Sequence, residues 1–84
     1  MRYLIELRLY ENGEDNVYEN FIYEDLLSEK PYALADAIET GVKAAKSIKR
    51  KVKVVVYELI NESETGPSLY FAVVQNSKII EENR

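Results

Sequence analysis

The residues best equipped for chemistry in this sequence are carboxylates near its beginning, at Glu11, Glu14, Asp15 and Glu19. A pair of carboxylates can act as general acid and general base, and a cluster of them can bind calcium. The run 11–16, however, lacks the ligand order and the distal glutamate of a calcium-binding loop. A chain of 84 residues also has little volume for a substrate pocket. We expect no catalytic residue and no metal ligand among them.

The same residues, which we call the acidic hairpin (Glu11, Glu14, Asp15 and Glu19), have a non-catalytic use. Surface carboxylates in a row can imitate a phosphate backbone and occupy a basic groove on a protein partner. They can also simply keep a small domain in solution. Both interpretations are open at this point.

The other groups that most reactions use are missing. The sequence contains no histidine and no cysteine, which removes the commonest general base, thiol nucleophiles, thiolate zinc sites and disulfides. Its three glycines cannot build a phosphate-binding loop. No stretch approaches the roughly 20 apolar residues of a membrane span, and the N-terminus does not read as a signal peptide. We therefore expect a non-enzymatic protein without a cofactor, placed in a reducing cytoplasm and away from membranes.

Basic residues are concentrated in one later segment. Residues 41–53 contain six of them and no acidic residue, which defines the basic cluster: Lys43, Lys46, Lys49, Arg50, Lys51 and Lys53. Such a cluster can contact phosphates or an acidic partner. The helix dipole alone also favours lysine at the end of a helix, and the net charge of −4 opposes nucleic-acid binding. Nucleic acid is thus an alternative partner rather than the first expectation.

Seven tyrosines are present in the 84 residues. If Ile5 and Val54 face the helix, strand alternation places four tyrosines on the sheet face that the helix leaves open, at Tyr10, Tyr18, Tyr57 and Tyr70. Tyrosine is enriched at protein interfaces, so this face could bind a partner or a second copy of the chain. Tyrosine is also a good strand former, and ordinary cross-strand packing is the alternative explanation.

The elements that must position these residues follow from periodicity. Alternation and β-branched or aromatic content predict strands at 2–10, 17–23, 52–60 and 69–75, with a short fifth strand at 79–80. The Asn12-Gly13 pair predicts a hairpin loop, and Gly66-Pro67 predicts a loop over 61–67.

Between residues 31 and 49 the apolar residues recur every three or four positions, which predicts an amphipathic helix. Ser28 is its expected N-cap. Gly41 lies in the apolar stripe, where it lowers helix propensity by about 1 kcal/mol relative to alanine. We therefore expect the helix to approach the sheet closely at Gly41.

Together these elements predict a single α+β domain over residues 1–84. It has an antiparallel sheet of four strands, or five, with one helix on one face, in the order ββαββ. One helix covers only one face of such a sheet, so the second face must be solvated, self-associated or bound to a partner.

This order, the length and the acidic balance resemble the small anti-CRISPR proteins encoded by phages. In several of these a single helix, comparable to the one expected here from Ala33 to Lys46, packs on an antiparallel sheet made of two hairpins. The resemblance spans the chain as topology and rests on no sequence motif, so it assigns no functional residue. It implies a non-enzymatic inhibitor that binds a large nucleic-acid-handling effector in the host cytoplasm, by steric blocking or nucleic-acid mimicry.

The expected function is therefore protein binding through the open sheet face or the acidic hairpin. The alternatives are a nucleic-acid-binding domain that uses the basic cluster and a homodimer in which the open faces pair.

Overall fold

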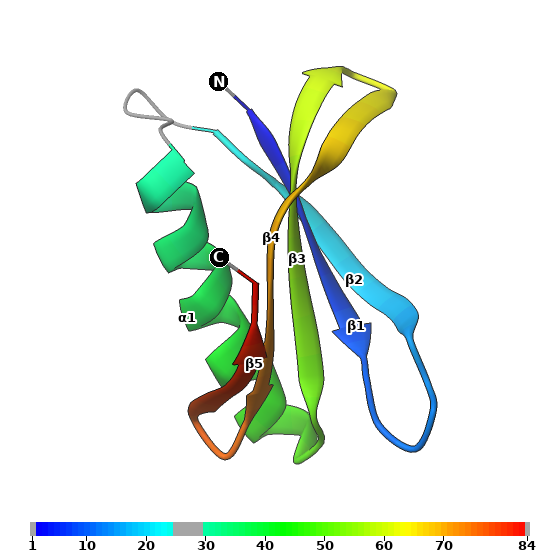
Figure 1. The fold of residues 1–84 in the computed structure, drawn as a ribbon, viewed down its shortest axis with the longest axis vertical. Helices are drawn as coiled ribbons and strands as arrows, with labels where there is room; N and C mark the ends of the chain where they lie inside the picture. The colour runs from blue at the N-terminus through cyan, green and yellow to red at the C-terminus, as the bar shows by residue number, and fades with distance from the viewer. Residues whose placement is uncertain (1, 25–29, 84) are drawn as a thin grey trace.

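The computed structural model describes residues 2–24 and 30–83, so the expected N-cap Ser28 lies outside the described residues. Six elements follow one another along the chain (Figure 1): β1 (Tyr3–Leu9), β2 (Asn16–Tyr23), α1 (Lys30–Ile48), β3 (Val52–Asn61), β4 (Glu64–Gln75) and β5 (Lys78–Glu82). The fold is α+β, with one helix and a five-stranded antiparallel sheet among the described residues. The element order is ββαβββ, one strand longer than the four-strand expectation.

The strands lie in the spatial order β2-β1-β3-β4-β5, and every neighbouring pair is antiparallel. β1 therefore lies inside the sheet, between β2 and β3, and pairs with β3 from Tyr3↔Glu58 to Leu9↔Val52. The helix connects β2 to β3 and lies against one side of the sheet (Figure 1). β2 and β5 are left as the two edge strands.

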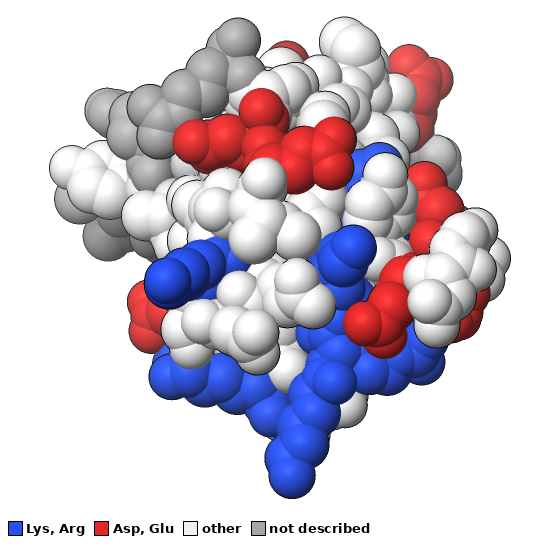
Figure 2. All heavy atoms as spheres, turned by 60° about the horizontal axis from the view of Figure 1, so that its bottom comes forward, with Lys and Arg blue, Asp and Glu red and all other residues white. Residues whose placement is uncertain are grey.

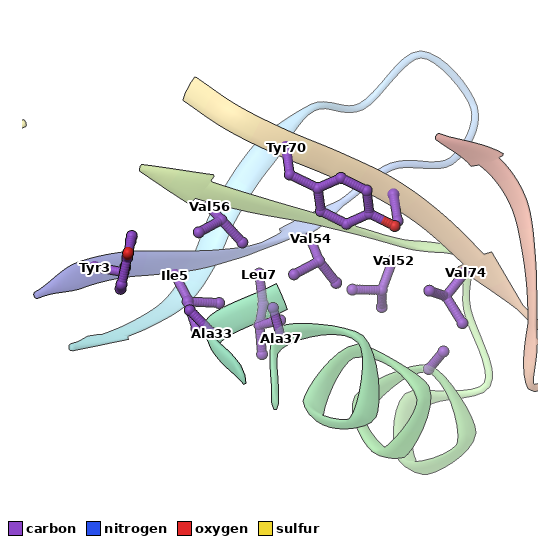
Figure 3. Packing of buried hydrophobic residues seen from close by; sticks show 12 residues of the cluster. Tyr3, Ile5, Leu7, Ala33, Ala37, Val52, Val54, Val56, Tyr70 and Val74 are labelled. Atoms are coloured by element: carbon purple, nitrogen blue, oxygen red, sulfur yellow. The ribbon is translucent and has the colours of Figure 1, made fainter. Parts of the chain in front are cut away.

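The core lies between α1 and the three central strands. Ile5 and Val54, expected to face the helix, are buried in it, as are Leu7 and Val56. Figure 3 shows these side chains between the sheet and the helix, together with Tyr70 of β4. Burying each large apolar side chain contributes about 1.5–3 kcal/mol, so this layer stabilises the domain.

A row of small residues brings the helix onto the sheet. Ala33, Ala37, Gly41 and Ala45 are buried at intervals of one helical turn, whereas larger residues such as Leu34 flank the core as partly buried neighbours. A Cβ atom added to Gly41 would overlap Cγ2 of Val54. The close approach expected at Gly41 is therefore confirmed.

One loop prediction is wrong in detail. Residues 61–67 do not form a loop, because β4 already begins at Glu64 and the reversal is confined to the residues between β3 and β4. There the Ser63 amide donates a hydrogen bond to Oδ1 of Asn61 at 3.0 Å. Gly66 and Pro67 lie where the β3–β4 register shifts, an irregularity that tolerates both residues within a strand.

The fifth strand is longer than predicted. It runs from Lys78 to Glu82 and follows a two-residue turn in which Asn76 and Ser77 have positive φ angles of 51° and 65°. Two positive φ angles suit the twist of a tight hairpin. β4 and β5 therefore form a third hairpin among the described residues, after β1–β2 and β3–β4.

Candidate interaction surfaces

The acidic hairpin and the basic cluster, predicted as separate surfaces, meet in the structure. Arg50, between α1 and β3, forms an ion pair with Glu14, and its Nε lies 3.4 Å from Oε2 of Glu11. Nζ of Lys53 lies 3.6 Å from Oδ2 of Asp15. Three of the four acidic-hairpin carboxylates are therefore neutralised within the molecule.

Arg8 of β1 fixes the same loop from the open face of the sheet. Its Nη1 donates to Oδ1 of Asp15 at 3.1 Å and to the Asp15 carbonyl at 3.2 Å, and its Nη2 donates to Oε1 of Glu6 at 3.1 Å. Burial alone would lower the pKa of Arg8, but the hydrogen bonds to Asp15 and Glu6 raise it overall. Sequence reasoning did not identify Arg8, because nothing in the sequence indicates that this residue contacts the loop between β1 and β2.

Lys53 extends this network across the open face. Its Nζ lies 4.9 Å from the ring centroid of Tyr10 and 5.0 Å from that of Phe71. A cation over two aromatic rings is attracted by their negative faces. The ammonium group of Lys53 is therefore engaged by residues of the same molecule and is not available to bind phosphate.

Tyr57 lies on the open face, as predicted, opposite Leu4 of β1. Burial, followed by the negative charge of Glu6, raises the pKa of its phenol. The neighbouring Val55 and Val73 are buried, because the aromatic and charged side chains of this face cover them. The open face is thus largely closed by its own side chains rather than exposed as an apolar patch.

The prediction for the other two tyrosines needs correction. Tyr70 is not on the open face: it pairs with Val56, is only 5% exposed and belongs to the core, where its hydroxyl donates a hydrogen bond to Glu82. Tyr18 lies where the β1–β2 register shifts, as the extra residue between Val17 and Glu19. It is an exposed edge residue, and the four tyrosines do not form one surface.

The remaining basic residues gather at the end of the molecule where α1 stops. Figure 2 shows lysine and arginine side chains across this end, with acidic side chains beside them. Lys43 pairs with Glu39 at 3.1 Å. Lys46, Lys49 and Lys51 have no ion-pair partner in the part of the chain that the structure describes. Lys46 and Lys49, but not Lys51, line a cleft of about 420 Å³ between the end of α1 and the β4–β5 turn.

β2, at one edge of the sheet, exposes three large apolar residues. Val17, Tyr18 and Ile22 are 41%, 38% and 47% exposed. Glu19, the fourth acidic-hairpin residue, is exposed on the same strand and has no ion-pair partner among residues 2–24 and 30–83. Sequence reasoning missed Val17 and Ile22, although three consecutive large residues from Phe21 to Tyr23 were a signal, since alternation cannot bury all three.

Within the described residues, no group of three or more acidic side chains is placed to hold a metal ion. No helix of the described chain has the length and apolar character needed to cross a membrane.

No protein-family model, characterised protein or solved structure matches this chain.

Proposed function

We propose that this chain is a non-enzymatic protein-binding module that takes an extended segment of its partner onto the free edge of β2. The observation that carries the proposal is the exposure of Val17, Tyr18 and Ile22 on an eight-residue edge strand. A strand at the edge of a sheet presents unpaired backbone groups to another chain, and strand addition is a common mode of peptide recognition.

The other edge supports the choice of β2 by contrast. β5 has five residues, of which Lys78, Glu81 and Glu82 are charged. Short length, charged side chains and β-bulges all protect an edge from pairing. Both edge pairs contain a register shift, so length and charge distinguish the two edges. β2 is longer, and its only charged residue is Glu19.

The side chains of β2 determine which residues the partner's extended segment needs. Val17 and Ile22 pair with Arg8 and Leu4 and so lie on the open face, whereas Glu19 pairs with Leu7 and lies on the helix side. An added strand therefore needs apolar residues on one face and a basic residue on the other, beside Glu19. A second copy of β2 lacks any basic residue, and so fits this edge less well.

An inhibitor of the anti-CRISPR type, acting in the host cytoplasm, remains the proposed biological role. The ion pairs of Glu11, Glu14 and Asp15 favour steric blocking over nucleic-acid mimicry, because paired carboxylates present little net negative charge to a basic groove. The nucleic-acid alternative is weaker for a related reason. Three of the six basic-cluster residues, Lys43, Arg50 and Lys53, are already in ion pairs.

The test compares two edge substitutions in capture from a host lysate and in assays against purified CRISPR effectors. Ile22→Lys places a charge on the β2 edge, and Ile80→Lys places the same charge on β5, where Ile80 is 51% exposed. We expect at least a tenfold loss of capture and inhibition with Ile22→Lys and no loss with Ile80→Lys. Equal binding by the two variants would refute the proposal. So would light scattering that shows a parent dimer which Ile22→Lys dissociates, because the occupant would then be a second copy.

A further inference from the structure

The cleft at the end of α1 is a polar site that lies away from the β2 edge. Its walls come from α1 and the segment that follows it, from the β1–β2 loop, and from the end of β4 with the β4–β5 turn: Glu11, Ala45, Lys46, Lys49, Arg50, Gln75, Asn76 and Ser77. The volume of about 420 Å³ falls within the range of ligand sites, which is about 300–1,000 Å³. All but one of these side chains are polar, so the cleft suits a polar ligand.

The charges around the cleft favour an anion. Three cations, Lys46, Lys49 and Arg50, line the cleft with one carboxylate, Glu11. Arg50 pairs both with Glu11 and with Glu14, which is outside the lining, so an excess of one positive charge is left. The end of a helix adds a partial negative charge of roughly one half, which is smaller than the positive excess. Charges elsewhere on this acidic chain are screened beyond about 8 Å at physiological salt. The local field of Lys46 and Lys49 therefore decides which ions enter.

The backbone around the cleft gives a second reason. Lys49 has a φ of 56° and Ser77 a φ of 65°. The left-handed region costs residues other than glycine about 1–2 kcal/mol, and glycine usually occupies the position after a helix. The φ of Ser77 suits the tight β4–β5 turn, whereas at Lys49 a cationic side chain stands where glycine would relieve strain.

We propose that this cleft binds the phosphate group of a small phosphorylated ligand. The ammonium groups of Lys46 and Lys49 supply the charge, and Asn76 and Ser77 supply neutral hydrogen-bond donors from the β4–β5 turn. The volume exceeds that of inorganic phosphate, which leaves room for the rest of a phosphate ester such as a nucleoside monophosphate. The site does not depend on the β2 edge or on the proposed protein partner.

The experiment is an NMR titration of the whole chain with inorganic phosphate and, separately, with adenosine monophosphate. Sodium chloride at the same ionic strength controls for non-specific screening. We expect saturable shifts at the amides of Lys49, Asn76 and Ser77, with tighter binding of the monophosphate ester than of inorganic phosphate. The Lys46→Gln/Lys49→Gln double variant should weaken binding at least tenfold. Lys43→Gln should leave it unchanged, because Lys43 pairs with Glu39 and lies outside the cleft.

Three results would overturn the proposal. The first is a linear response that sodium chloride reproduces, and the second is unchanged binding by the double variant. The third is a single-stranded oligonucleotide that binds at least tenfold more tightly than the monophosphate, which would make the cleft part of a nucleic-acid surface. None of them affects the β2 edge, so the two proposals fail separately.

Discussion

Arg50 donates a hydrogen bond to the carboxylate of Glu14 and thereby ties the end of α1 to the loop between β1 and β2. Glu11 joins the pair through Nε of Arg50. Hydrogen bonds to Glu14 and then to Glu11 raise the pKa of Arg50, so the guanidinium stays charged throughout the working range. Exposed ion pairs contribute little to overall stability, and this one acts mainly by holding the loop in place.

Replacing Arg50 should therefore loosen the loop without unfolding the domain. In Arg50→Gln we expect faster hydrogen exchange at the amides of residues 11–15 and little change in the unfolding midpoint. Hydrogen-exchange mass spectrometry measures the first quantity and urea denaturation the second. Lys43→Gln, which removes the Lys43–Glu39 pair, is the matched control and should leave the loop unchanged. Unaltered exchange in Arg50→Gln would show that Arg8 and Lys53 hold the loop without it.

Gly41→Ala should destabilise the protein despite improving helix propensity. The added methyl group gains about 1 kcal/mol of propensity, but it would overlap Val54 and push α1 away from β3. Overpacking a core costs about 1–3 kcal/mol, so we expect a net loss of up to about 2 kcal/mol in the free energy of unfolding. Gly66→Ala is the control, since its Cβ would lie 3.5 Å from Cδ1 of Ile60, an ordinary contact. A variant Gly41→Ala as stable as the parent would show that the helix shifts at no cost.

The raised pKa of Tyr57 should make stability depend on alkaline pH. Burial and the charge of Glu6 raise this pKa above its ordinary value of 10.0, so the folded state holds the phenol proton more tightly than the unfolded state. That contribution is complete below about pH 10 and is lost as the pH rises through the folded-state pKa.

Tyr57→Phe removes the contribution. The variant also loses the hydrogen bond between the Tyr57 hydroxyl and Glu6, so we expect it to be less stable than the parent by about 1 kcal/mol at neutral pH. This difference in stability should narrow above about pH 10. Urea denaturation at a series of pH values gives the comparison. Tyr32→Phe, at a side chain that is 51% exposed on α1, should show neither effect. If the difference in stability between parent and variant stays constant to high pH, the pKa of Tyr57 is the same in the folded and unfolded states.

The helix and most of the strands were predictable, because the spacing of apolar residues along the sequence differs between the two kinds of element. The strand containing Val54 and the helix containing Gly41 stand out through spacing alone. The face of Tyr70 was not predictable, because β4 has apolar residues at both alternating positions and the β3–β4 register shifts next to its partner Val56. Pattern alone cannot decide between two apolar faces.

The site was less predictable than the fold because it depends on strand order. Glu11 and Arg50 are 39 residues apart, and they meet only because β1 lies beside β3 in the sheet. Nothing in the composition of either segment specifies that neighbour. The β2 edge was hidden for the same reason, since an edge exists only once the order of the strands is known.

The position of β1 inside the sheet has a consequence for how the chain folds. In the β1–β2 hairpin and in the β3–β4–β5 meander, the paired strands are close in sequence. The β1–β3 seam, where these two units meet, instead pairs Tyr3 with Glu58 and Leu9 with Val52. Such long-range pairing raises contact order and slows folding. During synthesis the first hairpin must wait for β3 to leave the ribosome, and closure of the β1–β3 seam is the step expected to set the folding rate.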